Sequence, residues 1–163
     1  MSDSSGIHAV LLVTPKGQII HERFMAPVDA TQVSQLKLGV VDLLAVSAHD
    51  LTRGDLQLGT LPYWDAPCPV VFRRVNDVVF LVVGGSTQLP VDLESSLENI
   101  VAGLLMVISG SRLGEASLFE AYDKVAMVVE EVLGGIGRGV EQIPPEMIRD
   151  AILFSDINPK MKR

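Results

Sequence analysis

The sequence has 163 residues, of which 48% are hydrophobic and 20% are charged, and its formal net charge is −7. This length fits a single domain, and the apolar content is too high for a disordered protein. The acidic balance argues against non-specific nucleic-acid binding, which requires a basic surface, and no apolar run reaches the roughly 18 residues that a membrane-spanning helix needs.

Residues 1–6 are small and polar, and we expect them to form a disordered N-terminus. They contain no basic segment followed by an apolar one, so the sequence predicts no signal peptide. The single cysteine, Cys68, excludes an internal disulfide and fits a reducing compartment. Because it lies between Pro67 and Pro69, we expect a small buried side chain rather than a reactive thiol. These features together predict a cytosolic protein.

The beginning of the chain predicts a hairpin. Ile7–Val13 is apolar almost throughout, which is typical of a strand buried on both faces. Thr14–Gly17 has the proline and glycine spacing of a tight turn. Gln18–Phe24 then continues as the second strand.

The next segment changes to a helical period. Over Asp29–Ser47 apolar residues recur at spacings of three and four, as in an amphipathic helix, with Asp29 or Thr31 as the N-cap. His49–Pro69 is rich in glycine and proline, which predicts a long irregular connection. Alternating leucines within it predict a short edge strand in Asp55–Tyr63.

A second hairpin is predicted from strands Pro69–Val75 and Asp77–Val83, which meet at a turn on Asn76 and Asp77. The second of these strands is wholly apolar, so we expect it in the middle of the sheet. The residues Gly84–Ser86 end it.

The remainder of the chain has a helical period. Apolar spacing predicts helices over 93–108 and 118–133, and a short final helix that begins at Pro144. Because the strands occur as hairpins, the fold class is α+β, with a five-stranded antiparallel sheet flanked by helices on both faces. A parallel Rossmann-type sheet is disfavoured. We expect one domain over 7–154 and a C-terminal tail over 155–163.

Gly134–Gly139 has the composition of a phosphate-binding loop but not its context. Such loops leave a strand and open a helix, so that backbone N–H groups meet the anion. Here a predicted helix precedes the glycines, and the lysine and Ser/Thr of a P-loop are missing. We therefore expect the glycines to end that helix and form a turn.

Other side chains give no catalytic pattern. His8, His21 and His49 lack metal-site spacing; His8 and His21 are expected to approach each other across the first hairpin, but a zinc site needs three or four ligands. Glu130 and Glu131 are adjacent in a predicted helix, so their side chains diverge. The sequence therefore predicts no catalytic residue, no cofactor and no metal.

The candidate functional residues are instead apolar side chains that a partner protein would cover. Tyr63 and Trp64 form an aromatic pair in the predicted irregular connection, and aromatic residues often anchor interfaces. Met106 and Val107 fall outside the apolar line of the helix over 93–108. In the helix over 118–133, Ala126 and Val128 flank the apolar face and Met127 extends it. Because large exposed apolar patches are uncommon on monomers, we predict partner contacts at Tyr63, Trp64, Met106 and Met127. The alternative is that the helices simply cover one another.

Three stretches resemble the longin-type small subunits of vesicle coats, namely the zeta subunit of coatomer and the sigma subunits of clathrin adaptors. They are IHAVLLVTPKGQIIHERF (7–24), PVVFRRVNDVVFLVVGG (69–85) and LFEAYDKVAMVVEEVLGGIGRGVEQIPPEMIRDAI (118–152). They resemble the first hairpin, the central hairpin with its terminal Gly-Gly, and an apolar helix with an acidic pair and a glycine-marked exit. The resemblance spans residues 7–154, and its Gly-Gly leans toward the zeta type.

Two departures qualify this resemblance. Ser117–Tyr122 carries Glu120 and Ala121 where sigma subunits have an asparagine-containing, aromatic-rich stretch that shapes a dileucine pocket. Dileucine cargo recognition is therefore in doubt. The proline-rich segment Leu61–Pro69 matches neither branch, so a small subunit of a TSET- or TPLATE-type endocytic adaptor complex remains an alternative.

The resemblance implies a longin-like fold and a non-catalytic scaffold role. Such a subunit docks to the helical solenoid of a large coat or adaptor subunit, contacts other coat subunits, and reaches a membrane only through the complex. It implies a cytoplasmic, peripherally membrane-associated protein of Golgi, endosome or plasma-membrane coats, with no nucleic-acid partner. The rival classes are a longin- or roadblock-type regulator of small GTPases and a small enzyme with an unrecognised site.

Overall fold

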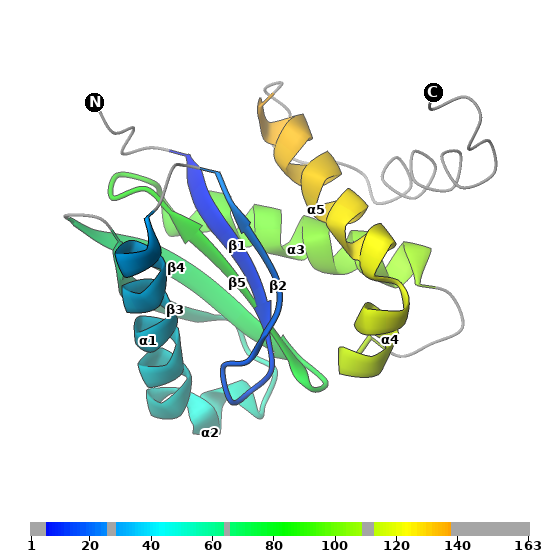
Figure 1. The fold of residues 1–163 in the computed structure, drawn as a ribbon, viewed down its shortest axis with the longest axis horizontal. Coiled ribbons are helices and arrows are strands. Elements are labelled where there is room, and N and C mark those ends of the chain that lie inside the picture. The colour runs from blue at the N-terminus through cyan, green and yellow to red at the C-terminus, as the bar shows by residue number, and fades with distance from the viewer. Residues whose placement is uncertain (1–5, 26–28, 64–65, 109–112, 138–163) are drawn as a thin grey trace.

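The computed structural model describes residues 6–25, 29–63, 66–108 and 113–137. Its centre is one five-stranded antiparallel sheet in the order β2-β1-β5-β4-β3 (Figure 1). The strands are β1 (Ile7–Val13), β2 (Ile19–Phe24), β3 (Gln57–Tyr63), β4 (Ala66–Val75) and β5 (Val78–Gly84). The predicted α+β class with five antiparallel strands is confirmed, and the wholly apolar β5 lies in the middle of the sheet, as expected.

Helices cover both faces of this sheet (Figure 1). They are α1 (Ala30–Val46), α2 (Ala48–Leu51), α3 (Pro90–Val107), α4 (Glu115–Glu120) and α5 (Tyr122–Gly137). The helix α1 packs on one face, whereas α3 and α5 pack on the other and against each other. Asp29 is the N-cap of α1, where its carboxylate accepts the N–H of Gln32 at 2.8 Å in a capping box.

The apolar sequence of β5 follows from its position between two cores. Successive side chains of a strand point to opposite faces, so Val79, Leu81 and Val83 join the core under α1. The intervening side chains, including Phe80, join the core under α3 and α5. Every residue of β5 is buried, and burying each large apolar side chain contributes about 1.5–3 kcal/mol.

The first hairpin turns where the sequence predicts it. The N–H of Gly17 donates to the carbonyl oxygen of Thr14 at 2.8 Å, and the N–H of Thr14 donates to Gln18 at 2.8 Å. Gly17 has a φ of +93°, which favours glycine. A Cβ at this position would also lie 2.7 Å from Cγ2 of Val41, so the turn fits closely against α1.

The segment 49–69 is not the predicted irregular connection, but the short edge strand predicted within Asp55–Tyr63 is confirmed as β3. The segment consists of α2, the edge strand β3 and the first part of β4, and β3 pairs with β4 as far as Tyr63 opposite Ala66. The prolines are tolerated because β5 pairs with β4 only from Val70 onward. Within the described part of the chain, the strands β3 and β4 therefore extend past β5 as a two-stranded arm. A proline there lacks an N–H that no third strand requires.

The helix predicted over 118–133 is two helices. The short α4 ends at Ala121, whose N–H donates to the carbonyl oxygen of Ser117, and α5 begins at Tyr122. The predicted stop at Gly134 is also wrong, because α5 continues to Gly137. Glycine in a helix costs only about 1 kcal/mol relative to alanine, which the buried apolar face of α5 offsets. Gly139, the predicted helix at Pro144 and the predicted tail lie outside the described residues.

Candidate protein-docking surface

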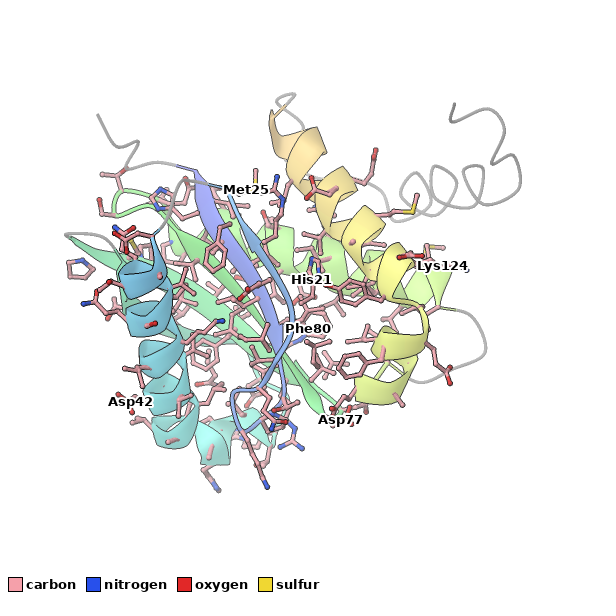
Figure 2. The ribbon with its side chains drawn as sticks, viewed as in Figure 1. His21, Met25, Asp42, Asp77, Phe80 and Lys124 are labelled. Carbon is pink, nitrogen blue, oxygen red and sulfur yellow. The ribbon has the colours of Figure 1, made fainter. Side chains whose placement is uncertain are left out.

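The helix α1 has an outward face without the charge that solvated helices usually carry. Only two of its 17 residues are charged, Lys37 and Asp42. Its inward residues, Leu36, Val40 and Leu44, are buried against the sheet, whereas Asp42 projects away from the sheet (Figure 2). An amphipathic surface helix normally presents a polar face to water. A helix that also carries large apolar side chains on its exposed side suits a second packing partner.

We define the α1 outward face by five exposed residues: Ser34, Leu38, Val41, Ala45 and Val46. The first four recur at intervals of four, three and four, so they form one stripe along the helix. Leu38 is 68% exposed and Val46 is 86% exposed. Their burial against a partner would gain roughly 25 cal/mol for each Å² of apolar surface removed from water.

Other exposed apolar side chains are distributed over several elements. Leu58 lies on β3, Leu105 on α3, Phe119 on α4 and Tyr122 at the beginning of α5. Single exposed apolar residues of this kind are normal on protein surfaces. The α1 outward face differs because its apolar residues follow one another along a single helix.

The structure separates the predicted contact residues. Met106 is half-buried on α3, and Met127 is partly buried on α5, where it packs against the core. Tyr63 is the last residue of β3 rather than part of a loop, and Trp64 lies outside the described residues. The four therefore do not form one described patch.

Two residues of the helices follow the alternative prediction, that the helices cover one another. Val107 and Val128, which the apolar spacing left outside the helix lines, are 3% and 0% exposed. They join the core because α3 and α5 pack against each other as well as on the sheet. Sequence reasoning missed the α1 outward face, although the scarcity of charged residues between Ala30 and Val46 was a signal for it.

A polar contact ties α5 to the edge strand β2. Nδ1 of His21 lies 3.2 Å from the hydroxyl of Tyr122, and the two rings meet edge to face with centroids 5.5 Å apart. Figure 2 shows His21 between β2 and α5. About two turns further along α5, Glu130 accepts a hydrogen bond from Nε of Arg23 on β2. Burial lowers the pKa of His21 below its usual value, an effect that the nearby carboxylates of Glu130 and Glu22 oppose.

The predicted approach of His8 to His21 is wrong. The register places His21 opposite Leu12, whereas the carbonyl oxygen of His8 accepts the N–H of Met25 at 2.8 Å. Within residues 6–25, 29–63, 66–108 and 113–137, no three His, Cys, Asp or Glu side chains are grouped to hold a metal ion. Cys68 is 2% exposed, and burial raises the pKa of its thiol, so it is a poor nucleophile.

The turn between β4 and β5 holds the beginning of α4. Asn76 has a φ of +56°, and its Nδ2 donates to the carbonyl oxygen of Leu113. Oδ1 of Asp77 accepts the N–H of Glu115 at 2.9 Å. An open concavity of about 600 Å³ lies beside this turn. Its lining is Arg74, Asn76, Asp77, Leu113, Gly114, Glu115, Ala116, Ser117 and Glu120.

Comparisons with known proteins define the fold. No family model matches the chain, and no curated protein matches it. Among known structures it is similar to a chain of the "Homology model of the full-length AP-3 complex in a stretched open conformation", with a TM-score of 0.66 and 17% identity over 96% of this chain and 98% of that chain. The chain therefore shares its longin-like fold, a five-stranded antiparallel sheet with flanking helices, with that chain of the complex. No helix in the described part of the chain is both long and apolar enough to cross a bilayer.

Proposed function

We propose that this chain is a non-catalytic small subunit of a heteromeric vesicle coat or adaptor complex, of the zeta or sigma type, which docks to the helical solenoid of a large subunit. It would act in intracellular membrane trafficking, in the cytoplasm, and would reach a Golgi, endosomal or plasma membrane only through the complex. The observation that carries this proposal is the α1 outward face, where Leu38, Val41 and Val46 are exposed beside a single exposed charge, Asp42.

The fold supports the same assignment. The similarity to an AP-3 complex chain extends over 96% of this chain and 98% of the other, so it involves both helical layers and the whole sheet. A solenoid presents rows of helices, and the stripe Ser34–Ala45 has the four-three-four spacing that packs against another helix. Such an obligate contact between subunits is expected to be large and apolar.

Two alternatives use the same fold. A small subunit of a TSET- or TPLATE-type endocytic adaptor would also bind a large solenoid subunit, and the identity of the co-purifying chains separates it from the zeta and sigma types. A longin- or roadblock-type regulator of small GTPases would instead bind a GTPase or a second longin domain. A nucleotide-exchange assay and the oligomeric state of the pure protein distinguish that class.

The decisive experiment is a pull-down of the full-length protein from its native cytosol with identification of the bound chains. We expect a large coat or adaptor subunit, and we expect Leu38→Glu to abolish its capture. Leu58→Glu is the matched control, because Leu58 is 64% exposed, close to the 68% of Leu38, but lies on β3. Unchanged melting temperatures of both variants would show that neither loses its fold.

The predicted contacts at Met106 and Met127 form a separate arm of this experiment. Met106→Glu tests the α3 surface at a half-buried side chain, so its melting temperature is compared with that of the parent, whereas Met127 packs against the core. Loss of the large subunit with Met106→Glu but not with Leu38→Glu would move the docking surface to α3. If the pure chain instead captures only a GTPase or no solenoid subunit at all, the proposed function is wrong.

A further inference from the structure

A smaller concavity lies at the opposite side of the β4–β5 turn from α4. Its volume is about 310 Å³, and its lining is Leu51, Thr52, Arg53, Gly54, Arg74 and Asn76. It forms where the residues that follow α2 meet the end of β4. None of these lining residues is acidic and two are arginines, although the whole chain has a formal net charge of −7. The lining residues therefore carry two positive charges, and the nearby Asp55 carboxylate adjoins only Arg53.

Arg74 is held in place at this hollow. Its Nε donates to the carbonyl oxygen of Asn76 at 2.5 Å, and its side chain is half-buried. Asn76 is itself fixed, because its Nδ2 donates to Leu113. This bond uses one of the five N–H donors of the guanidinium, so the two terminal nitrogens keep their donors. A planar guanidinium group that is fixed in this way is preorganised to bind an oxyanion.

Arg53 supplies the second guanidinium. Its Nε lies 3.3 Å from Oδ2 of Asp55, and both side chains are more than half exposed. An exposed pair of this kind contributes little, and Asp55 is not part of the lining. Arg53 is therefore available to a ligand that reaches the hollow. Two guanidinium groups match the charge of about −1.5 to −2 that a phosphate carries at neutral pH.

We propose that this hollow binds the phosphate group of a phosphorylated polyol, which is presented either by a lipid headgroup or by a molecule free in solution. Arg53 and Arg74 would bind the phosphate oxygens, and the Thr52 hydroxyl, which donates to His49, keeps lone pairs for a ring hydroxyl. This proposal does not depend on docking through α1.

The position of the phosphate follows from the two neighbouring concavities. Both are lined by Arg74 and Asn76. The larger one also contains the carboxyl groups of Asp77, Glu115 and Glu120, which would repel an anion. The phosphate therefore belongs on the side of Arg74 that faces Arg53.

The test uses the full-length protein and two probes at low salt. Inositol hexakisphosphate is titrated by calorimetry, and vesicles of phosphatidylcholine with a phosphatidylinositol phosphate are compared by co-sedimentation with phosphatidylserine vesicles of the same surface charge. We expect Arg53→Gln and Arg74→Gln each to weaken binding roughly tenfold or more. Lys37→Gln is the control, because it removes the same charge from α1.

The outcomes separate the sources of the ligand. Loss of both probes in the Arg53→Gln, Arg74→Gln double variant supports the site, and preference for one probe identifies a lipid headgroup or a soluble phosphate as the source. Arg53 is exposed, so its substitution tests binding even if Arg74→Gln disturbs the turn. Absence of binding to both probes, or equal weakening by Lys37→Gln, overturns the proposal.

Discussion

Two leucines on α1 give a direct test of the idea that this helix has one face for folding and one for a partner. Leu36 is 0% exposed and packs in the core under α1, whereas Leu38, two residues further along, is 68% exposed. Replacing a fully buried leucine by alanine costs about 3–5 kcal/mol, because burial is lost and a cavity remains. Leu38→Ala removes no buried contact, so we expect a change within about 0.5 kcal/mol.

Urea and thermal unfolding of the pure chain measure the difference. For a domain of this size, 1 kcal/mol shifts the melting temperature by about 2–4 °C, so Leu36→Ala is expected to lower it by roughly 6–20 °C. The urea midpoint should fall with an unchanged slope, since the surface exposed on unfolding is nearly the same. The melting temperature of Leu38→Ala should equal that of the parent.

A large destabilisation by Leu38→Ala would refute the reasoning. It would mean that the α1 outward face is already packed in the free protein, for example against a second copy. Dilution distinguishes these cases, because stability that comes from self-association falls with protein concentration. The face would then be an interface between copies rather than an open surface for a large subunit.

Two further substitutions test local contacts. Gly114→Ala is expected to lower the free energy of unfolding in urea by about 1 kcal/mol. The new Cβ would lie 2.9 Å from Oδ1 of Asp77 and displace the carboxylate that accepts the N–H of Glu115. Equal costs of the substitution in the parent and in an Asp77→Ala background would contradict this cause. The buried His21 has a pKa below its unfolded value of about 6.5, so the folded chain binds fewer protons than the unfolded one. Its contribution to stability is complete above about pH 6.5 and is lost as the pH falls below that value. We expect His21→Gln to reduce the fall of the melting temperature with decreasing pH, whereas the same change at the exposed His49 should not. An unaltered fall in the His21→Gln variant would exclude this histidine as its source.

Much of the fold was predictable because its strands and turns are locally specified. The apolar runs of β1 and β5 are explained by burial on both faces. The turn chemistry at Gly17 and Asn76 fixes both hairpins, and both residues have positive φ angles. The N-cap at Asp29 also marks the beginning of α1 correctly. In each of these places, residues near in sequence determine the structure.

The errors have a common physical cause, which is tertiary context. Prolines usually indicate loops, but in β4 they occupy the part that extends past β5. Gly134 usually ends a helix, but α5 continues beyond it because its preceding turns are anchored in the core. The predicted contacts favoured α3 and α5, whose residues Val107 and Val128 are covered by each other's helices. Apolar periodicity does not reveal which helix lacks a covering neighbour, and the low charge of α1 was the local signal for it.

The two edges of the sheet help to explain why docking would use a helix face. An unprotected edge strand invites pairing with another chain. At one edge, β2 carries Glu22 and Arg23, and Arg23 donates both to Glu130 of α5 and to the carbonyl oxygen of Phe24. Charged side chains of this kind discourage strand addition.

At the other edge, prolines have the same effect. Pro62 lies opposite Pro67, and Pro69 lies opposite Thr60. A proline has no N–H to donate, so these must be the pairs that are not hydrogen-bonded across β3 and β4, and their backbone nitrogens point outward. Pro62 therefore removes one donor from the free edge of β3, and Pro67 and Pro69 remove two from the opposite side of the arm. Charges on β2 and Pro62 on β3 both make strand addition less favourable, which favours docking through side-chain packing on a helix face such as that of α1.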